Sequence, residues 1–383
     1  MGKIYTALGL MSGTSLDGVD FSIIQTDGKE YLSLSDNNYI EFSNTLRQKI
    51  REIKSKITST NKCKEIIKSD EYKDLSDEIT MFHQEGMIRT VGYGGDRPID
   101  IIGFHGITLW HKPPDKYTHQ IGDAKLLKKS IAKYKNLKNS EIIFNFRKND
   151  ILNEGQGAPL TPIYHKALMK HLKIVDPRLI VNIGGITNVT YLNRGNIFST
   201  DIGPGNCLID KWMTKNFDKD FDKDGKIALE GKINQNIANN FLDKLKKTKK
   251  NKNVSYDTSD FDISEFNKLN PKDGVATLSF ITAKAILNFA KDLDLKRIII
   301  CGGGRLNQAI LNNLKKDRFI ISLMEDVKSS QSDDLIWNLN GDFIESQAFA
   351  YIAVRSFLKL PISFPETTGC NKPCTGGVII ENF

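Results

Sequence analysis

The sequence has few cysteines and no long apolar run. Only five cysteines occur in 383 residues, too few and too widely spread for a disulfide framework, so we expect reduced thiols and a cytoplasmic protein. Cys370 and Cys374 have a C-x3-C spacing, but no second Cys or His pair completes a zinc site. No apolar run reaches the roughly 18 residues that a membrane span needs. The apolar residues 4–11 lead into turn residues and not into a signal-peptide cleavage site, so we expect no membrane association.

Arginine is also scarce. The chain has 54 basic and 46 acidic side chains, a formal charge of +8, yet only 11 of the basic residues are Arg. Arg is the side chain that makes bidentate contacts with phosphates and base edges. The densest basic run, residues 244–252, has no interleaved aromatic residues on which bases could stack. We therefore expect a solvated lysine-rich surface and no nucleic-acid partner.

Three common ligand motifs are absent. The chain has no G-x-x-x-x-G-K-[ST] loop, and its run of three glycines at 302–304 lacks the G-x-G-x-x-G spacing. A P-loop ATPase and a dinucleotide-dependent oxidoreductase are both disfavoured. Residues 218–225 look like a calcium loop, but counting Asp220 as position 1 puts Gly231 where a bidentate Glu is required. We interpret this segment as an acidic surface loop.

What is present is the pattern of an α/β protein in two parts. Short β-rich runs that end in glycine alternate with helical stretches, and the length predicts two domains. Strands predicted at 4–11, 19–26 and 31–42 have counterparts at 178–183, 187–192 and 197–202. This repetition indicates an internal duplication with domains at 1–175 and 176–383. The last long helix, predicted at 341–358, could pack back on the first domain.

Glycine-rich turns follow three of the predicted apolar strands. They lie at 9–18, 201–206 and 302–307, with Ser, Thr, Asp and Asn among the glycines. Glycine lets the backbone approach an anion, and free N–H groups at turns and helix starts bind phosphate. One such turn is weak evidence, because glycine also ends strands. Three in one βα chain indicate a cradle for ATP.

A second set of polar residues follows other strands. Arg147 and Asp150 are three residues apart directly after a predicted strand, and His105 and Glu345 lie near the ends of other elements. These side chains could line a pocket. A local ion pair, or a histidine packed in the core, explains the same pattern.

Eight motifs together resemble one family. They are GLMSGTSLDGVD at 9–20, QIGD at 120–123, FRKND at 146–150, GQGAPL at 155–160, NIGGITN at 182–188, DIGPGN at 201–206, GGGRLN at 302–307 and ESQAFA at 345–350. Their order and nearly end-to-end extent resemble the anhydro-N-acetylmuramic acid kinases. The resemblance implies an α/β fold of two duplicated actin-like (ribonuclease H-like) domains around a nucleotide cleft. It also implies a bacterial enzyme of cell-wall recycling, in the cytoplasm and as a homodimer.

The implied reaction uses ATP, Mg²⁺ and water to open the 1,6-anhydro ring of the amino sugar and to phosphorylate O6. The resemblance makes Asp201 the base that activates water, and Asp17 a ligand of Mg²⁺ through water. Candidate sugar-binding residues are His105, Arg147, Asp150 and Glu345. The residues implied for ATP are Gly13, Thr14, Ser15, Leu16, Asp17, Gly18, Val19, Asp20, Gly203, Gly205, Gly302, Gly303 and Gly304.

Four positions depart from the family pattern. Ile107, Asn145, Glu154 and Ile202 stand where the family usually has Gln, Asp, Gly and Thr. Asn145 removes a charge near the expected sugar pocket, which leaves substrate preference open. Two rival functions follow: a kinase of the same fold that phosphorylates another sugar without opening a ring, and a non-catalytic regulator that binds sugar or nucleotide.

Overall fold

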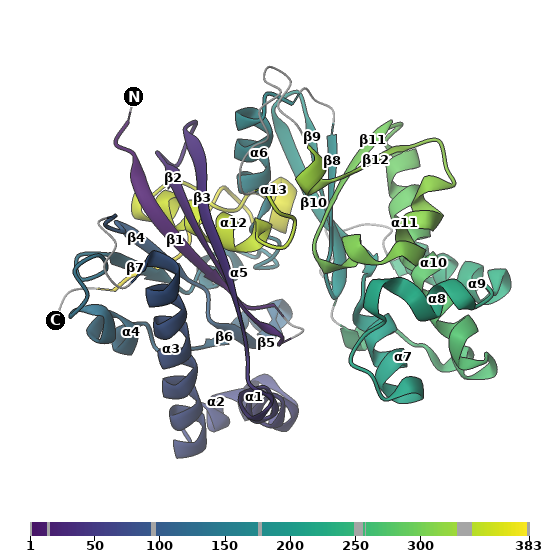
Figure 1. The fold of residues 1–383 in the computed structure, drawn as a ribbon, viewed down its shortest axis with the longest axis horizontal. Coiled ribbons are helices and arrows are strands. Elements are labelled where there is room, and N and C mark those ends of the chain that lie inside the picture. The colour runs from purple at the N-terminus through teal and green to yellow at the C-terminus, as the bar shows by residue number, and fades with distance from the viewer. Residues whose placement is uncertain are drawn as a thin grey trace. The chain divides into compact units, whose positions relative to one another are not determined.

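The computed structural model describes residues 2–13, 16–92, 97–174, 178–248, 256, 258–327 and 339–380. The chain divides into two units, each described by itself below (Figure 1). Unit 1 comprises Met1–Lys173, Leu335–Leu339 and Phe343–Phe383, and unit 2 comprises Ile174–Asp334 and Asn340–Asp342. The second predicted domain, 176–383, therefore differs from unit 2, because the C-terminal segment belongs to unit 1.

Unit 1 is built on a six-stranded sheet in the order β13-β7-β4-β1-β2-β3. Strands β1 (Tyr5–Met11), β2 (Gly18–Thr26) and β3 (Leu32–Glu41) form an antiparallel meander, while β4 (Ile101–Phe104) and β7 (Glu141–Phe144) continue parallel to β1. The short β13 (Val378–Ile379) closes the other edge antiparallel to β7.

Three serines divide the chain after β3 into separate helices. Ser43, Ser59 and Ser69 each accept a backbone N–H at the start of a helix, as N-cap residues do. The helices are α1 (Asn44–Lys56), α2 (Thr60–Ile66) and α3 (Asp70–Val91). Unit 1 also contains α4 (Ala124–Ile131), α5 (Lys148–Leu152), α6 (Pro162–His171), α12 (Ile344–Phe357) and α13 (Pro365–Thr368). A hairpin of β5 (Ile107–Lys112) and β6 (Tyr117–Ile121) was not predicted from the sequence.

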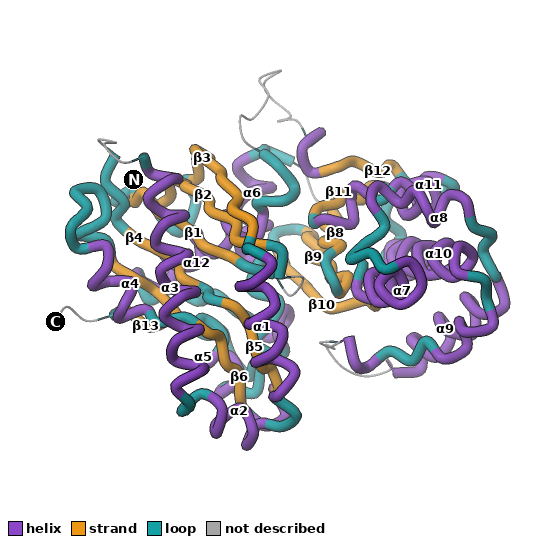
Figure 2. Tube along the Cα trace, turned by 60° about the horizontal axis from the view of Figure 1, so that its bottom comes forward, coloured by secondary structure: helices purple, strands orange, loops and turns teal. Residues whose placement is uncertain are grey.

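Helices cover both faces of this sheet (Figure 2). Phe21, on one face, would be 2.1 Å from a Cβ on Gly86 of α3. Gly9 and Gly103 are register partners on β1 and β4, and a Cβ on either would lie within 2.4 Å of a backbone oxygen of α12. Alternate residues of a strand point to opposite faces. The paired glycines therefore let α12 lie directly against the sheet.

Unit 2 repeats the strand order of unit 1. Its sheet runs β10-β9-β8-β11-β12, with β8 (Arg178–Ile183), β9 (Ile186–Asn193) and β10 (Asn196–Pro204) antiparallel, and β11 (Arg297–Cys301) and β12 (Ile320–Leu323) parallel to β8. Its helices are α7 (Cys207–Phe217), α8 (Lys226–Glu230), α9 (Gln235–Thr248), α10 (Pro271–Asp292) and α11 (Gln308–Lys315). The shared order, an antiparallel meander followed by parallel strands, confirms the predicted α/β class and the duplicated actin-like fold.

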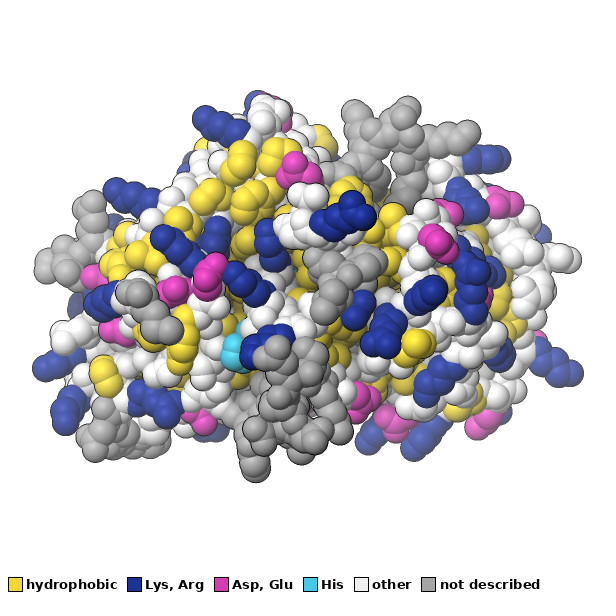
Figure 3. Space-filling view, turned by 90° about the horizontal axis from the view of Figure 1, so that it is seen from above, with side chains coloured by type: hydrophobic (Ala, Val, Ile, Leu, Met, Phe, Trp, Pro, Cys, Tyr) yellow, Lys and Arg dark blue, Asp and Glu magenta, His cyan; other side chains and the backbone are white. Residues whose placement is uncertain are grey.

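Each unit has its own hydrophobic core. The unit 2 core includes Leu208, Ile209, Trp212 and Met213, the apolar stripe of α7. Among the described residues, no helix combines the length and the apolar composition needed to cross a membrane. On the face shown in Figure 3, Lys and Arg side chains are dispersed and interspersed with Asp and Glu.

Candidate active site

The turn between β1 and β2 carries most of the residues predicted to hold phosphate. Its second half is fixed by Arg47 of α1, which donates from Nε to the Leu16 carbonyl at 3.0 Å and from Nη2 to the Asp17 carbonyl at 3.4 Å. Arg47 is itself paired with Glu41 at 3.1 Å. Leu16 has a φ of 60° and is buried. Thr14 and Ser15 lie outside the described residues, so their predicted contacts stay predictions.

Ser12 is a residue of this turn that the sequence analysis missed. Its side chain is 3% exposed, and its hydroxyl has no hydrogen-bond partner among the described residues. A buried hydroxyl without a partner costs stability, so such a group at a turn fits a site that a ligand oxygen completes. The only signal in the sequence was its place beside Gly13.

Carboxylates gather at the far end of the same turn. Burial, together with the charges of Asp17, Glu41 and Asp20, raises the pKa of Tyr39 to about 12, so all three carboxylates act on its hydroxyl. Asp17 is exposed at the turn. Carboxylate oxygens with room for water are the ligands that Mg²⁺ prefers. The donor set therefore fits the predicted role of Asp17.

The predicted sugar-binding residues converge on Arg147. Arg147 Nε donates to His105 Nε2 at 3.0 Å, and Nη1 donates to the Gly157 carbonyl at 2.9 Å. His105 Nδ1 then donates to the Gly106 carbonyl at 2.8 Å. Burial, reinforced by the charge of Arg147, holds the pKa of His105 well below its usual value. His105 is therefore neutral, and the hydrogen bonds determine its tautomer.

The charges of Glu345 and Asp150 also act on Arg147. Burial lowers the pKa of Arg147, and both carboxylates oppose this effect. Glu345 lies in the first turn of α12, whereas Arg147 precedes α5, so the fold brings together residues almost 200 positions apart. An arginine remains charged at any physiological pH. The cluster presents a guanidinium whose orientation is set by His105 and Gly157.

Asp150 contacts the protein with both carboxylate oxygens. It is 1% exposed; Oδ2 accepts from the Gly157 N–H and Oδ1 from Thr368 Oγ1, each at 2.6 Å. The same turn is held by His111, whose Nε2 lies 2.9 Å from the Gln156 carbonyl oxygen. Asp150 thus holds the turn that supports Arg147. His111 was not predicted, because its contact depends on the hairpin β5–β6.

Two of the four departures from the family pattern lie at positions with an unusual backbone conformation. Glu154 has a φ of 68° and Asn145 a φ of 61°, both in the left-handed region. Glycine adopts this region without cost, and Asn tolerates it better than other residues. Glu154 is exposed and pairs with Lys116. Asn145 therefore suits its backbone, whereas Glu154 takes a conformation that glycine would adopt more easily.

Asp201 lies near the end of β10 and is 8% exposed. Its Oδ2 accepts the backbone N–H of Tyr256 at 2.8 Å. It is the register partner of Asn188, and the ladder is irregular between Asp201 and Gly203. This irregularity changes the direction of the chain immediately after the carboxylate, as a β-bulge does.

The glycines of unit 2 have different surroundings. The N–H groups of Gly205 and Cys207 donate to the Gly185 carbonyl, and that of Asn206 donates to the Gly184 carbonyl. Gly205 therefore joins two turns, and a Cβ there would be 2.2 Å from the Gly184 oxygen. Gly203 has a φ of 152°, at the limit of the region that favours glycine.

The three glycines in the turn after β11 differ in how much space surrounds them. A Cβ on Gly302 would be 2.2 Å from Asn182 Oδ1, and one on Gly304 2.2 Å from Ile183, but a Cβ on Gly303 meets no described residue within 4 Å. Arg305, buried, stabilises the turn through Glu325 at 2.8 Å and Asp342 at 2.8 Å. Space beside Gly303 is what the predicted adenosine contact requires.

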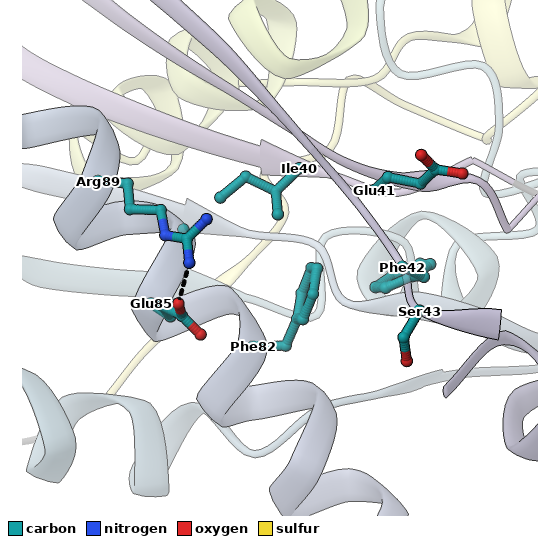
Figure 4. Close-up of a pocket in the computed structure, with 8 residues that line it drawn as sticks. Ile40, Glu41, Phe42, Ser43, Phe82, Glu85 and Arg89 are labelled. Carbon is teal, nitrogen blue, oxygen red and sulfur yellow. Dashed lines mark hydrogen bonds and ion pairs between the residues drawn. The ribbon is translucent and has the colours of Figure 1, made fainter. Parts of the chain in front are cut away.

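A separate cavity of about 410 Å³ opens in unit 1 between the end of β3 and α3 (Figure 4). Phe42 and Phe82 lie in it with ring centroids 4.9 Å apart, and Glu85 pairs with Arg89 at its rim. None of the predicted site residues that the structure describes lines it. It adjoins the phosphate turn through Glu41, the partner of Arg47, and through Phe42, whose N–H donates to the Asp17 carbonyl at 2.9 Å.

Two units of one strand order, each an antiparallel meander followed by parallel strands with glycine turns at strand ends, define a protein of the actin-like class. The profile of the family described as "Anhydro-N-acetylmuramic acid kinase" matches residues 5–382. The chain belongs to this family.

Three relatives carry that family's name. The anhydro-N-acetylmuramic acid kinase of Pelagibacter ubique is 39% identical over 395 residues, and that of Brucella canis 35% identical over 389 residues. That of Agrobacterium fabrum is 34% identical over 390 residues, and all three alignments cover 100% of both chains. Among solved structures, a ROK family glucokinase from Streptomyces griseus in complex with glucose and AMPPNP has a TM-score of 0.39 at 8% identity, covering 91% of this chain and 99% of that chain. That similarity is too low to support an assignment.

Proposed function

We propose that the chain uses ATP and water to convert 1,6-anhydro-N-acetylmuramic acid into N-acetylmuramic acid 6-phosphate, in the recycling of cell-wall peptidoglycan. Family membership over residues 5–382 supports the substrate. The observation that carries the chemistry is the buried Asp201, one of whose carboxylate oxygens is held by the Tyr256 N–H at 2.8 Å. A carboxylate held in this way has a defined orientation for proton transfer.

Asp201 acts as the general base in this proposal. It takes a proton from water, the water oxygen forms a bond to C1 of the sugar, and the bond from C1 to the bridging oxygen breaks. The attack comes from the face opposite the leaving oxygen, as in an inverting glycosidase. A positioned carboxylate base contributes about 10² to 10⁴ in rate. The bridging oxygen stays on C6 and accepts the γ-phosphoryl group that ATP supplies when bound.

Arg147 has a charge and an orientation suited to the lactyl carboxylate of this sugar. Its Nε and Nη1 are used by His105 and Gly157, so its remaining N–H groups can bind an anion. We place Glu345 and His105 at the same sugar through their proximity to Arg147. For Asp150 we propose a positioning role, because both its oxygens hold the protein.

We propose the ATP contacts of each unit separately. Ser12 and residues 13–20 of unit 1 would hold the phosphates, since the Ser12 hydroxyl is buried and has no partner among the described residues. Gly203 and Gly205 would shape the second phosphate turn, and 302–304 the adenosine contact beside the open Gly303. Asp17 would hold Mg²⁺ through water, and that ion would neutralise phosphate charge. We further propose a cytoplasmic homodimer, which size-exclusion chromatography with light scattering would test.

Isotope labelling tests the reaction directly. Purified protein is incubated with the anhydro sugar, ATP and Mg²⁺ in water enriched in oxygen-18, and the product is analysed by mass spectrometry. We expect one heavy oxygen at C1 and a phosphate on O6. An unlabelled phosphorylated sugar would show a kinase that leaves the ring-opening step out, and binding without ATP consumption would show a regulator.

Asp201→Asn tests the assigned base. The amide oxygen can still accept the Tyr256 N–H, so we expect an unchanged fold and a loss of at least about 10² in kcat. Asp243→Asn, an exposed substitution on α9, is the matched control and should keep full activity. Full activity in Asp201→Asn would refute the base.

A further inference from the structure

Two cysteines and a carboxylate lie close together near the turn that supports Arg147. One oxygen of Asp150 and the Sγ atoms of Cys370 and Cys374 all lie within 4.8 Å of one another, and the three residues are buried. Asp150 belongs to α5, whereas both cysteines follow α13 in the C-terminal segment. The C-x3-C pair, which lacked a partner in the sequence, therefore acquires a third metal-ligating residue through the fold.

Further oxygen atoms adjoin this group. Cys370 and Cys374 both donate to the Lys372 carbonyl, at 3.1 and 3.0 Å. Ser363 is fully buried, and its hydroxyl has no hydrogen-bond partner among the described residues. Ser363 forms an antiparallel bridge with Cys374, and directly opposed residues in such a bridge point to the same side. The hydroxyl therefore lies on the cysteine side of the bridge, where a bound ion or its water would supply the missing partner.

The donor set suits a thiophilic cation. Two thiolates and a carboxylate, completed by a carbonyl oxygen or water, match the four-coordinate preference of Zn²⁺. Carboxylate ligands are normally held by a second set of hydrogen bonds, which the Gly157 N–H and Thr368 hydroxyl provide to Asp150. Each carboxylate oxygen has two lone pairs, so these bonds leave acceptor capacity for a metal.

We propose that Asp150, Cys370 and Cys374 form a structural site for a thiophilic divalent cation, with Zn²⁺ the preferred occupant. Both cysteine thiols release their protons to solvent when the two metal–sulfur bonds form, and no atom changes oxidation state. The bound ion would link the C-terminal segment to α5. Asp150 of α5 also accepts the N–H of Gly157, in the turn that supports Arg147. This site does not depend on the proposed sugar chemistry.

Without a cation, burial raises the pKa of Cys374 to about 12, and the neighbouring Cys370 adds to the effect. The thiols are then neutral, and a cation must displace their protons. Metal affinity should therefore rise with pH.

The test uses the full-length protein. The metal content of protein purified without chelator is measured by inductively coupled plasma mass spectrometry, and apo protein is titrated with Co²⁺ while the thiolate-to-metal charge-transfer absorption is recorded. We expect one equivalent of Zn²⁺, a saturable cobalt spectrum and a higher unfolding temperature with metal. Cys374→Ala should lose all three. Cys63→Ala, which removes another fully buried thiol of unit 1, is the matched control and should keep them.

Three results would overturn the site. One is wild-type protein that neither retains zinc nor gives a charge-transfer band with cobalt; this arm needs no variant, so a misfolded Cys374→Ala protein would not obscure it. A second is metal binding that persists in well-folded Cys374→Ala and Cys370→Ala. The third is an intact mass two protons lower than the reduced chain, with a peptide linking Cys370 to Cys374, which would show a disulfide.

Discussion

At the scale of single residues, replacing the Ser12 hydroxyl should affect ATP binding and protein stability in different ways. It is buried at the phosphate turn and has no partner among the described residues, so Ser12→Ala removes an unsatisfied group from the folded protein. We expect the unfolding temperature to stay level or rise, and the KM for ATP to rise by about five- to tenfold, the value of one hydrogen bond. Ser279→Ala is the control, because its hydroxyl is equally buried and unpartnered but lies on α10. Equal KM values in both variants would contradict a phosphate contact from Ser12.

Two adjacent glycines make a second residue-scale test. Gly302 has a φ of 78° and no room for a Cβ, whereas a Cβ on Gly303 meets no neighbour within 4 Å in the described part of the chain. Gly302→Ala should destabilise unit 2 by about 1 to 3 kcal/mol, from the strained backbone and the contact with Asn182. Gly303→Ala should leave stability within about 0.5 kcal/mol and raise the KM for ATP. Urea unfolding and steady-state kinetics measure the two effects, and an unchanged KM in Gly303→Ala would place adenosine elsewhere.

At the scale of elements, α12 depends on two glycines of the sheet. A Cβ on Gly103 would be 2.4 Å from the Phe349 carbonyl, so Gly103→Ala must displace the helix. We expect a loss of about 1 to 3 kcal/mol in the free energy of unfolding, as overpacking costs. Activity should fall as well, since the Phe349 ring lies 4.6 Å from that of His105. Gly2→Ala is the control, because its nearest neighbour would be at 3.8 Å.

Among the elements, those with local signals were predicted and those without were missed. The strands of both meanders follow from apolar runs that end in glycine. The hairpin β5–β6 is polar or half-buried along much of its length, so its residues carry little periodicity. His111, which holds the Gln156 carbonyl, lies on that hairpin and was missed with it.

At the scale of the whole molecule, buried histidines make stability depend on pH. Burial lowers the pKa of His83 to about 4, and those of His119 and His165 to about 4 and about 3. The unfolded chain then binds more protons than the folded protein below about pH 6.5, so stability is full above that pH and is lost as pH falls toward 4. At about pH 5 we expect His83 alone to cost about 2 kcal/mol.

His83→Leu removes one of the three histidines that bind a proton in the unfolded chain but not in the folded protein. Urea midpoints measured at about pH 7.5 and about pH 5 should differ less in this variant than in the parent. Lys135→Leu, an exposed substitution, would serve as the control with an unchanged difference. The same decline in His83→Leu as in the parent would mean that His83 does not set this pH dependence.

The division into units predicts how fragments behave. Unit 1 needs Phe343–Phe383 as well as Met1–Lys173, because α12 covers one face of its sheet. We expect the fragment 1–173 to lack a cooperative thermal transition, and 174–342 to show one by circular dichroism. Joining 343–383 to 1–173 through a flexible linker should restore the transition. A cooperative 1–173 fragment would show that α12 is dispensable for this unit.

The sequence by itself determined the α/β class, the repeated succession of strands along the chain, the family and the residue types of the proposed reaction, because these rest on local periodicity and on short motifs. Only the tertiary structure decided which distant residues meet. It shows that residues 343–383 belong to unit 1 and that Glu345 acts on Arg147. It also shows that Asp150 lies close to Cys370 and Cys374. Such contacts depend on packing between segments far apart in the chain, and no local pattern of side chains encodes them.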